Sequence, residues 1–282
     1  MKLLRYGPCG EERPGLLGPA GEIRDLSGVL ADIDAGALSP AGLARLQALD
    51  PLALPPVEGA PRLAPPVASV PKFICIGLNY ADHAAEAGMK APSEPIVFMK
   101  ATSAINGPND PIEIPRGAMK TDWEVELGVV IGSRAKYLSE AEALDHIAGY
   151  LVVNDVSERH FQAERGGQWT KGKSHDTFGP IGPWLVTKDE VPDPQDLDIW
   201  LEVDGKRYQD GNTSTMIFPV AHLVAYLSRF MTLMPGDIIA TGTPPGVGLG
   251  MKPEPIFLRP GQRLRLGVEG LGQQEAETVA AA

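Results

Sequence analysis

The sequence predicts a β-rich α+β protein of 282 residues, not a doubly wound parallel sheet. Glycine and proline are frequent, with 32 and 27 residues and no fixed period, as in chains with many short strands and tight turns. Short apolar or alternating runs outnumber segments with helical periodicity. Hydrophobic residues at 43% and charged residues at 22% are ordinary globular values, which excludes a disordered chain.

The first part of the chain is predicted to be a small N-terminal domain, residues 1–66, that ends in a proline-rich connector. Short strands are expected at its start, followed by a helix that Ser39 caps and Pro40 opens. Seven prolines between residues 51 and 71 disfavour both a helix and a central strand, so the domain boundary falls there. Residues 67–282 are expected to form the larger, catalytic domain.

The larger domain is predicted to consist of strands joined by turns, with few helices. Helices are expected at residues 79–87, from the capping box at residues 139–142 onward, and at residues 219–230. Strands are expected at residues 73–77, 123–129, 149–155, 197–203, 206–208 and 237–241, the fourth and fifth joined as a hairpin.

The charge balance excludes several classes of partner. With 25 basic and 36 acidic side chains the net charge is −11, which argues against nucleic acid and anionic membranes. No apolar run approaches the roughly 18 residues of a membrane span, and the N-terminus lacks a signal peptide. Two cysteines, Cys9 and Cys75, are too few for a disulfide scaffold. A cytoplasmic protein is expected.

Three carboxylates have the pattern of a metal site. Glu124 and Glu126 are two residues apart in a predicted strand, so they share one face with Cα atoms about 6.6 Å apart. Asp155 ends a strongly apolar strand, where a buried acid needs a partner. Oxygen ligands without a cysteine–histidine cluster indicate a hard cation, Mg²⁺ or Mn²⁺. The alternative for the two glutamates is a solvated sheet face.

Other reactive side chains lie on predicted helices and loops. His83 and Glu86 share a helix face, and a carboxylate beside an imidazole suits a general base; the alternative is a surface ion pair. Arg159 and Gln162 also share a face and offer donors to a carboxylate and a carbonyl, unless this is a solvated helix end. Lys173, in a glycine-rich loop, could hold an enolate or carboxylate, or simply be solvated.

Two further segments have simpler interpretations. Residues 241–248 are not a phosphate loop, because two prolines remove backbone donors and no Lys-Ser or Lys-Thr pair follows. A strand-end loop that presents the hydroxyl of Thr243 fits better. Cys75 lies inside an apolar strand, which favours core packing over nucleophilic catalysis. The G-x-S-x-G motif typical of serine hydrolases is absent from the sequence.

In chain order, five stretches resemble the fumarylacetoacetate hydrolase family. They are G-L-N-Y-A-D-H at 77–83, E-V-E-L-G-V-V at 124–130, V-N-D-V-S-E-R at 153–159, W-T-K-G-K-S at 169–174 and T-G-T-P-P-G-V-G at 241–248. The resemblance runs from about residue 72 to the C-terminus, and the combination is specific although each stretch alone is not. Residues 1–50 resemble the small N-terminal domain of the bacterial branch. Within that branch the chain is most similar to 2,4-diketo-3-deoxy-sugar-acid hydrolases of the rhamnonate or fuconate type.

The resemblance implies a mixed β-roll or sandwich fold, a homodimer and one Mg²⁺ or Mn²⁺ in each active site. Carried over position by position, it implies metal ligands Glu124, Glu126 and Asp155, a water-activating pair His83 and Glu86, an enolate-stabilising Lys173, and substrate-binding Arg159, Gln162 and Thr243.

The implied activity is hydrolytic cleavage of a C–C bond in a 2,4-diketo acid. The small-molecule 2-oxo acid would give pyruvate and a second carboxylic acid such as lactate. One alternative passes through the same enolate: an oxaloacetate decarboxylase or a 2-oxo-enoic diacid isomerase. Decarboxylation needs no attacking water, so it should be less sensitive to loss of Glu86. The other alternative is a non-catalytic ligand-binding protein, which would have no use for the pair His83 and Glu86.

Overall fold

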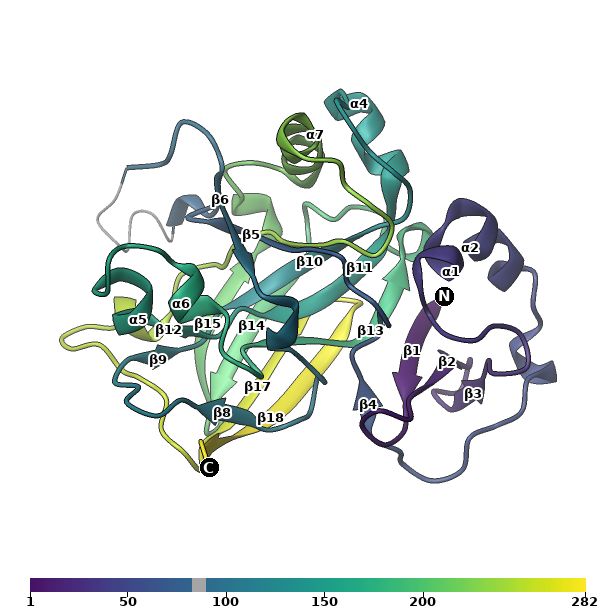
Figure 1. The fold of residues 1–282 in the computed structure, drawn as a ribbon, viewed down its shortest axis with the longest axis horizontal. Coiled ribbons are helices and arrows are strands. Elements are labelled where there is room, and N and C mark those ends of the chain that lie inside the picture. The colour runs from purple at the N-terminus through teal and green to yellow at the C-terminus, as the bar shows by residue number, and fades with distance from the viewer. Residues whose placement is uncertain (83–89) are drawn as a thin grey trace.

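The computed structural model describes residues 1–82 and 90–282, and its largest element is an eleven-stranded sheet (Figure 1). Its main path runs β3-β2-β1-β13-β11-β10-β16-β5-β6, with β4 paired to β1 and β7 to β13. These strands are β1 (Lys2–Tyr6), β2 (Arg13–Leu17), β3 (Ile23–Asp25), β4 (Leu63–Ala64), β5 (Phe73–Gly77), β6 (Ile96–Lys100), β7 (Ile105–Asn106), β10 (Val125–Ile131), β11 (Ile147–Asn154), β13 (Gly179–Thr187) and β16 (Ile238–Ala240).

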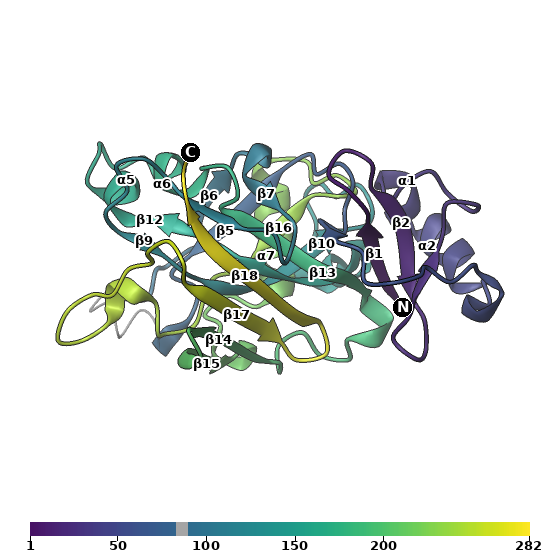
Figure 2. The ribbon, with the colours of Figure 1, turned by 90° about the horizontal axis from the view of Figure 1, so that it is seen from below.

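A five-stranded sheet packs against the larger one, and a two-stranded ribbon flanks them (Figure 2). The five strands, in sheet order, are β15 (Lys206–Asn212), β14 (Asp198–Val203), β17 (Arg263–Val268), β18 (Gly272–Ala280) and β8 (Ile112–Ile114). The ribbon consists of β9 (Thr121–Asp122) and β12 (Ser157–Glu158).

Helices are short and lie around the sheets. The α-helices are α1 (Ala35–Leu38), α2 (Pro40–Gln47), α4 (Glu140–Ala143), α5 (Arg159–Ala163), α6 (Thr170–Lys173) and α7 (Val220–Phe230). Single 3₁₀ turns occur at η1 (Pro51–Ala53), η2 (Thr102–Ala104), η3 (Leu144–His146), η4 (Lys188–Glu190), η5 (Thr213–Thr215) and η6 (Gly248–Gly250). The prediction of a β-rich α+β fold is therefore confirmed. None of the helices in residues 1–82 and 90–282 has the length and hydropathy needed to cross a membrane.

Strand β10 is buried on both faces, which decides how the active site forms. Val125, Leu127 and Val129 contribute to the core between the two sheets, whereas Val130 packs in a second core shared with the N-terminal strands. The period-two alternation therefore predicts the strand correctly, but the glutamate side is not a solvated face. Glu124 is only 6% exposed and Glu126 only 1%, so the solvated-face alternative is wrong.

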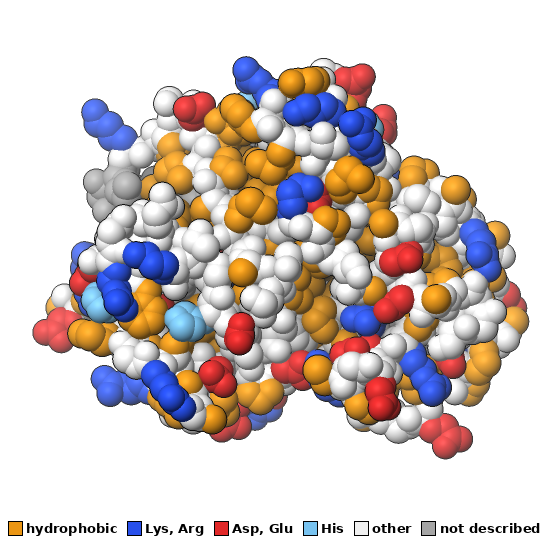
Figure 3. Space-filling view, in the orientation of Figure 1, with side chains coloured by type: hydrophobic (Ala, Val, Ile, Leu, Met, Phe, Trp, Pro, Cys, Tyr) orange, Lys and Arg blue, Asp and Glu red, His pale blue; other side chains and the backbone are white. Residues whose placement is uncertain are grey.

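The N-terminal segment extends the large sheet. Strand β1 pairs antiparallel with β13, so that Leu3 lies opposite Leu185. The helix predicted after it is present, with the Ser39 hydroxyl accepting the amide N–H of Gly42 and Pro40 in the first helical position. The division of the chain at residue 66 stays a prediction. On the face shown in Figure 3, acidic and basic side chains are interspersed.

Candidate active site

The register of β10 and β11 brings three carboxylates together. Glu126 lies opposite Val153 in this antiparallel pair, so Asp155 follows the end of β11 beside Glu124. The amide N–H of Asp155 donates to the carbonyl oxygen of Glu124 at 2.8 Å. One carboxylate oxygen from each of the three acids lies within 4.8 Å of the other two, and all three side chains are buried. Three convergent oxygens suit a hard divalent cation, so these residues could hold one.

Strand β16, next to β10, leads to the residue that holds the carboxylate of Glu126. Strand β16 pairs with β10 and leads directly into Gly242, whose amide N–H donates to Glu126 Oε2 at 2.8 Å. Gly242 has a φ of +99°, and a Cβ at this position would lie 2.7 Å from the Cβ of Asn79. Only glycine combines this backbone conformation with so close an approach, so the residue is required for the bond to Glu126.

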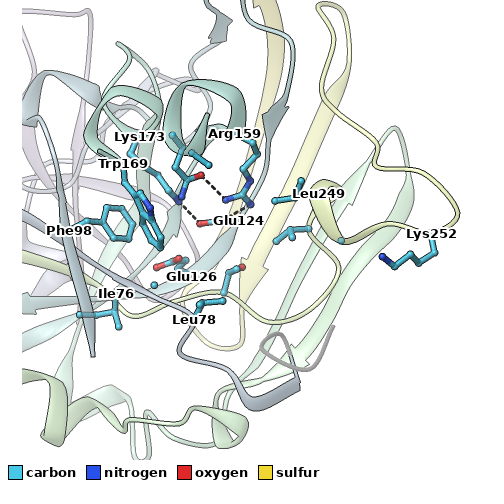
Figure 4. Close-up of a pocket in the computed structure, with 16 residues that line it drawn as sticks. Ile76, Leu78, Phe98, Glu124, Glu126, Arg159, Trp169, Lys173, Leu249 and Lys252 are labelled. Atoms are coloured by element: carbon cyan, nitrogen blue, oxygen red, sulfur yellow. Dashed lines mark hydrogen bonds and ion pairs between the residues drawn. The ribbon is translucent and has the colours of Figure 1, made fainter. Parts of the chain in front are cut away.

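Three buried cations surround the carboxylates. Lys173 Nζ donates to Glu124 Oε2 at 2.7 Å and to Asp155 Oδ2 at 2.8 Å (Figure 4). Arg159 Nη2 lies 2.6 Å from Glu124 Oε1. Lys100 Nζ lies 2.6 Å from Asp155 Oδ1 and donates to the carbonyl oxygen of Lys173 at 2.5 Å. Within the described part of the chain, Glu126 makes no ion pair with a lysine or arginine.

The surrounding charges and burial shift the pKa values of Glu124 and Glu126 in opposite directions. Burial opposes ionisation of Glu124, but Arg159 and Lys173 together lower its pKa to about 2. The pKa of Glu126 is raised well above its ordinary value by burial and by the negative charges of Asp155 and Glu124. Despite burial, the same two acids raise the pKa of Lys173. Of these two glutamates, Glu126 therefore gains more from an added cation.

A cavity of about 400 Å³ opens over these groups. Glu124, Glu126, Arg159 and Lys173 line its polar end. Its apolar wall includes Phe98, Trp169 and Leu249, and the rings of Phe98 and Trp169 meet edge to face with centroids 5.1 Å apart. Figure 4 shows Lys173, Arg159 and Glu124 meeting beside Glu126, with Phe98 and Trp169 on one side and Leu249 on the other. The cavity thus has a charged end and an apolar wall.

The structure brings most of the predicted site residues to this cavity. Arg159 and Gln162 lie on α5, where Arg159 Nη1 donates to Gln162 Oε1 at 3.2 Å, and both line the cavity. Thr243 also lines it, but its hydroxyl donates to the carbonyl oxygen of Val125 and accepts from Gln209 Nε2, so it can offer substrate only an acceptor. Lys173 lies at the end of helix α6, whereas the sequence predicted a loop.

The predicted water-activating pair lies outside the described residues. His83 and Glu86 both fall between residues 83 and 89, so their role stays a prediction. Cys75 is fully buried in β5 and burial raises the pKa of its thiol, which confirms the prediction of core packing.

Sequence reasoning missed two charged residues of the site. Asp122 precedes Glu124 by two residues and is wholly buried, so the alternation that singled out Glu124 and Glu126 applied to it as well. Lys100 ends the apolar strand β6 and is 2% exposed; a lysine at the end of such a strand was the available signal. Asp122 binds Arg159 and Lys100 binds Asp155, two of the residues predicted for the site.

The affinity of the site for Mg²⁺ is expected to rise with pH. In the metal-free protein the raised pKa of Glu126 favours a bound proton, which a cation must displace. As pH rises from the ordinary glutamate pKa of about 4.3 through the raised value, this competition is lost and binding tightens. Calorimetric titrations in buffers of different ionisation enthalpy would detect the released proton. Equal affinity and no proton release between pH 5 and pH 8 would contradict the expectation.

Three buried carboxylates, two lysines and an arginine form one cluster, and four of these six residues line the cavity. The cluster defines an enzyme site suited to a divalent cation and an anionic substrate. Residues 72–279 match the family described as Fumarylacetoacetate (FAA) hydrolase C-terminal. The chain belongs to the fumarylacetoacetate hydrolase family.

Individual relatives match along their whole length. A Burkholderia cenocepacia protein, named as a hydrolase without a substrate, is 68% identical over 278 residues, which is 99% of each chain. The structure of fumarylacetoacetate hydrolase from Exiguobacterium antarcticum is 36% identical with a TM-score of 0.89, over 100% of both chains. The structure of maleylpyruvate hydrolase from Sphingobium sp. SYK-6, in complex with manganese(II) and pyruvate, is 28% identical with a TM-score of 0.82, also over 100% of both chains.

Proposed function

We propose that the protein is a divalent-metal-dependent hydrolase that cleaves a 2,4-diketo acid into pyruvate and a second carboxylic acid. The observation that carries this proposal is the buried triad of Glu124, Glu126 and Asp155. Both glutamates of the triad line a cavity together with Lys173 and Arg159. The related maleylpyruvate hydrolase, whose structure is a complex with manganese(II) and pyruvate, supports it. The cation is Mg²⁺ or Mn²⁺.

The reaction consumes one water molecule. Water adds to the C4 carbonyl, the C3–C4 bond breaks, and the electron pair of that bond remains on C3 as the enolate of pyruvate, which then takes up a proton. The other product is the carboxylic acid that retains C4. A divalent cation held by the three carboxylates would supply Lewis acidity toward the oxygens of the keto acid.

The side chains of this chain have separate tasks in that reaction. Arg159 binds a substrate carboxylate through its guanidinium group, and Gln162 beside it offers an amide. Lys173 places an ammonium group against the developing enolate oxygen, where fixed charge stabilises the transition state. His83, oriented by Glu86, takes the proton from the attacking water. The apolar wall excludes bulk water, which strengthens these electrostatic interactions.

The deciding experiment measures pyruvate release with Mg²⁺ and with EDTA. The substrates are 2,4-diketo-3-deoxyrhamnonate, a simple acylpyruvate and oxaloacetate, because the sugar acids expected from the sequence are the first candidates. Metal-dependent release from either diketo acid would support the hydrolase. Release from oxaloacetate alone would replace it with the decarboxylase. The 35% identical structure titled 2-hydroxyhepta-2,4-diene-1,7-dioate isomerase from Mycobacterium marinum makes isomerisation a further assay.

His83→Ala is expected to slow hydrolysis strongly while Mg²⁺ and oxalate, an enolate mimic, still bind. The variant removes only the base, so its effect should fall on kcat and amount to about 10²–10⁴-fold. Glu86→Gln tests the orienting role and should slow hydrolysis more than any decarboxylation. His146→Ala is a control, because His146 lies in η3 and its ring hydrogen-bonds to Ser133. Undiminished turnover by His83→Ala would remove His83 from the mechanism.

A further inference from the structure

Asp122 contacts two cavity-lining residues from different elements, Arg159 and Leu249, and has no role in the function proposed above. It ends β9, is 0% exposed, and lies on the same side of the chain as Glu124. Its Oδ1 accepts the amide N–H groups of Trp123 at 2.8 Å and Gly248 at 2.7 Å. Its Oδ2 accepts the amide N–H of Leu249 at 3.0 Å and Arg159 Nε–H at 2.8 Å. A fully buried carboxylate thus receives four donors.

Two of these contacts, with the amide N–H groups of Gly248 and Leu249, hold a loop at the cavity. Val247, Leu249, Gly250 and Lys252 line the cavity, and Leu249 is 48% exposed. A Cβ on Gly248 would lie 2.7 Å from Asp122 Oδ1 and 1.9 Å from the carbonyl oxygen of Ile256. The loop therefore lies too close to Asp122 for any side chain at residue 248, and its position depends on this carboxylate.

The other contact fixes a guanidinium group. Arg159 uses Nε toward Asp122, Nη1 toward Gln162 and Nη2 toward Glu124. The bond at Nε helps to set the plane of the group, and Arg159 is one of the residues that line the cavity. Figure 4 shows Arg159 and Leu249 on the same side of the cavity, Arg159 next to Glu124 and Leu249 on the loop that leads to Lys252.

We propose that Asp122 is a positioning residue for substrate binding: through one carboxylate it sets both the guanidinium group of Arg159 and the cavity loop at residues 247–252. The role rests on the function proposed above. Asp122 acts through Arg159 and the loop: among the described residues its carboxylate binds Trp123, Gly248, Leu249 and Arg159, and none of the three acids of the triad. The prediction from this arrangement is a loss of substrate affinity without an equal loss of metal affinity.

The substitution Asp122→Asn separates these contacts. The amide oxygen can still accept from Trp123 and Gly248, but the NH₂ group faces two donors, the N–H of Leu249 and Nε–H of Arg159. We expect the Kd of oxalate, measured calorimetrically in saturating Mg²⁺, to rise at least about tenfold, as for other residues that orient a binding group. The Kd of Mg²⁺ should change by less than about threefold, and hydrogen exchange should accelerate in the peptide containing residues 248–249.

The matched control is Asp237→Asn. Asp237 is also 0% exposed, pairs with Lys72 at 2.6 Å, and accepts the amide N–H of Met234, at the end of β16 away from the cavity. This variant should lose stability but retain the oxalate Kd. If Asp122→Asn does not fold, Asp122→Glu keeps the charge but shifts the carboxylate away from its four donors, and it should weaken oxalate binding with Mg²⁺ binding kept.

A double-mutant cycle decides whether Asp122 acts through Arg159. In the Arg159→Met background, Asp122→Asn should weaken oxalate binding clearly less than it does in the wild-type background. Equal effects in both backgrounds, or an unchanged oxalate Kd in the single variant, would overturn the positioning role alone. A wild-type protein that neither binds oxalate with Mg²⁺ nor releases pyruvate would overturn the proposed function, and the positioning role with it.

Discussion

Replacing Lys173 with methionine is expected to lower kcat by about 10²–10³-fold, the usual effect of losing one donor to a developing oxyanion. Lys173 is 2% exposed and its Nζ contacts both Glu124 and Asp155. Methionine keeps the length and apolar stem of the side chain and can remain beside the ring of Phe98, which lies 5.0 Å from Nζ.

The same substitution should have the opposite effect on metal binding. In the metal-free protein Lys173 neutralises Glu124 and Asp155, two carboxylates that would otherwise attract a metal cation. Removal of Lys173 should therefore leave the Kd of Mg²⁺ unchanged or lower it. Lys171→Met is the matched control, since Lys171 is an exposed residue of the same helix. Normal kcat in Lys173→Met would exclude Lys173 from transition-state stabilisation. A weakened metal site would show that its role is structural.

Replacing Glu126 with glutamine is expected to abolish metal binding at micromolar concentrations and activity with it. Outer-shell changes already cost about 10–100-fold in metal affinity, and loss of a ligand should exceed that. The glutamine retains the acceptor for the amide N–H of Gly242 and nearly the same volume. Isothermal titration with Mg²⁺ and Mn²⁺ measures the effect directly.

Glu126→Gln should also make the metal-free protein more resistant to unfolding at neutral pH. The folded-state pKa of Glu126 is raised above its ordinary value, so ionisation of this group opposes folding above the unfolded-state pKa of about 4.3. Glutamine removes that cost. The free energy of unfolding in EDTA, from urea titration at pH 7.5, should therefore rise. An unaltered metal titration would rule out Glu126 as a ligand. A lower free energy of unfolding would contradict the inference that the charge of Glu126 is left uncompensated in the metal-free protein.

The residue types of the site were predictable where a local pattern carried them. Glu124 and Glu126 alternate along a strand and Asp155 ends another, so the sequence predicted a shared carboxylate site. The pairing of β16, the strand that leads to Gly242 and its bond to Glu126, was not predictable in the same way. Strand β5 pairs in parallel with β16, more than 160 residues later in the chain, and no local signal specifies that neighbour.

The missed residues have a common physical cause. Lys100 and Asp122 are charged groups that a composition-based analysis assigns to the surface, and their burial becomes reasonable only when their partners are known. Thr243 was expected to present its hydroxyl group to substrate. The donor is instead used within the fold, because the carbonyl oxygen of Val125 lies 2.8 Å away. Such pairings depend on contacts made in the folded chain, so the periodic patterns of the sequence do not reveal them.

The pairing of side-chain cations with the acidic cluster has a consequence for folding in the absence of metal. Lys100, Lys173 and Arg159 compensate most of the negative charge that the cluster would otherwise concentrate in the interior. The chain can therefore complete its folding before any divalent ion reaches it, unlike small domains whose folding energy comes from the metal. Under the proposed mechanism, EDTA should therefore remove activity without unfolding the protein, and added Mg²⁺ should restore it.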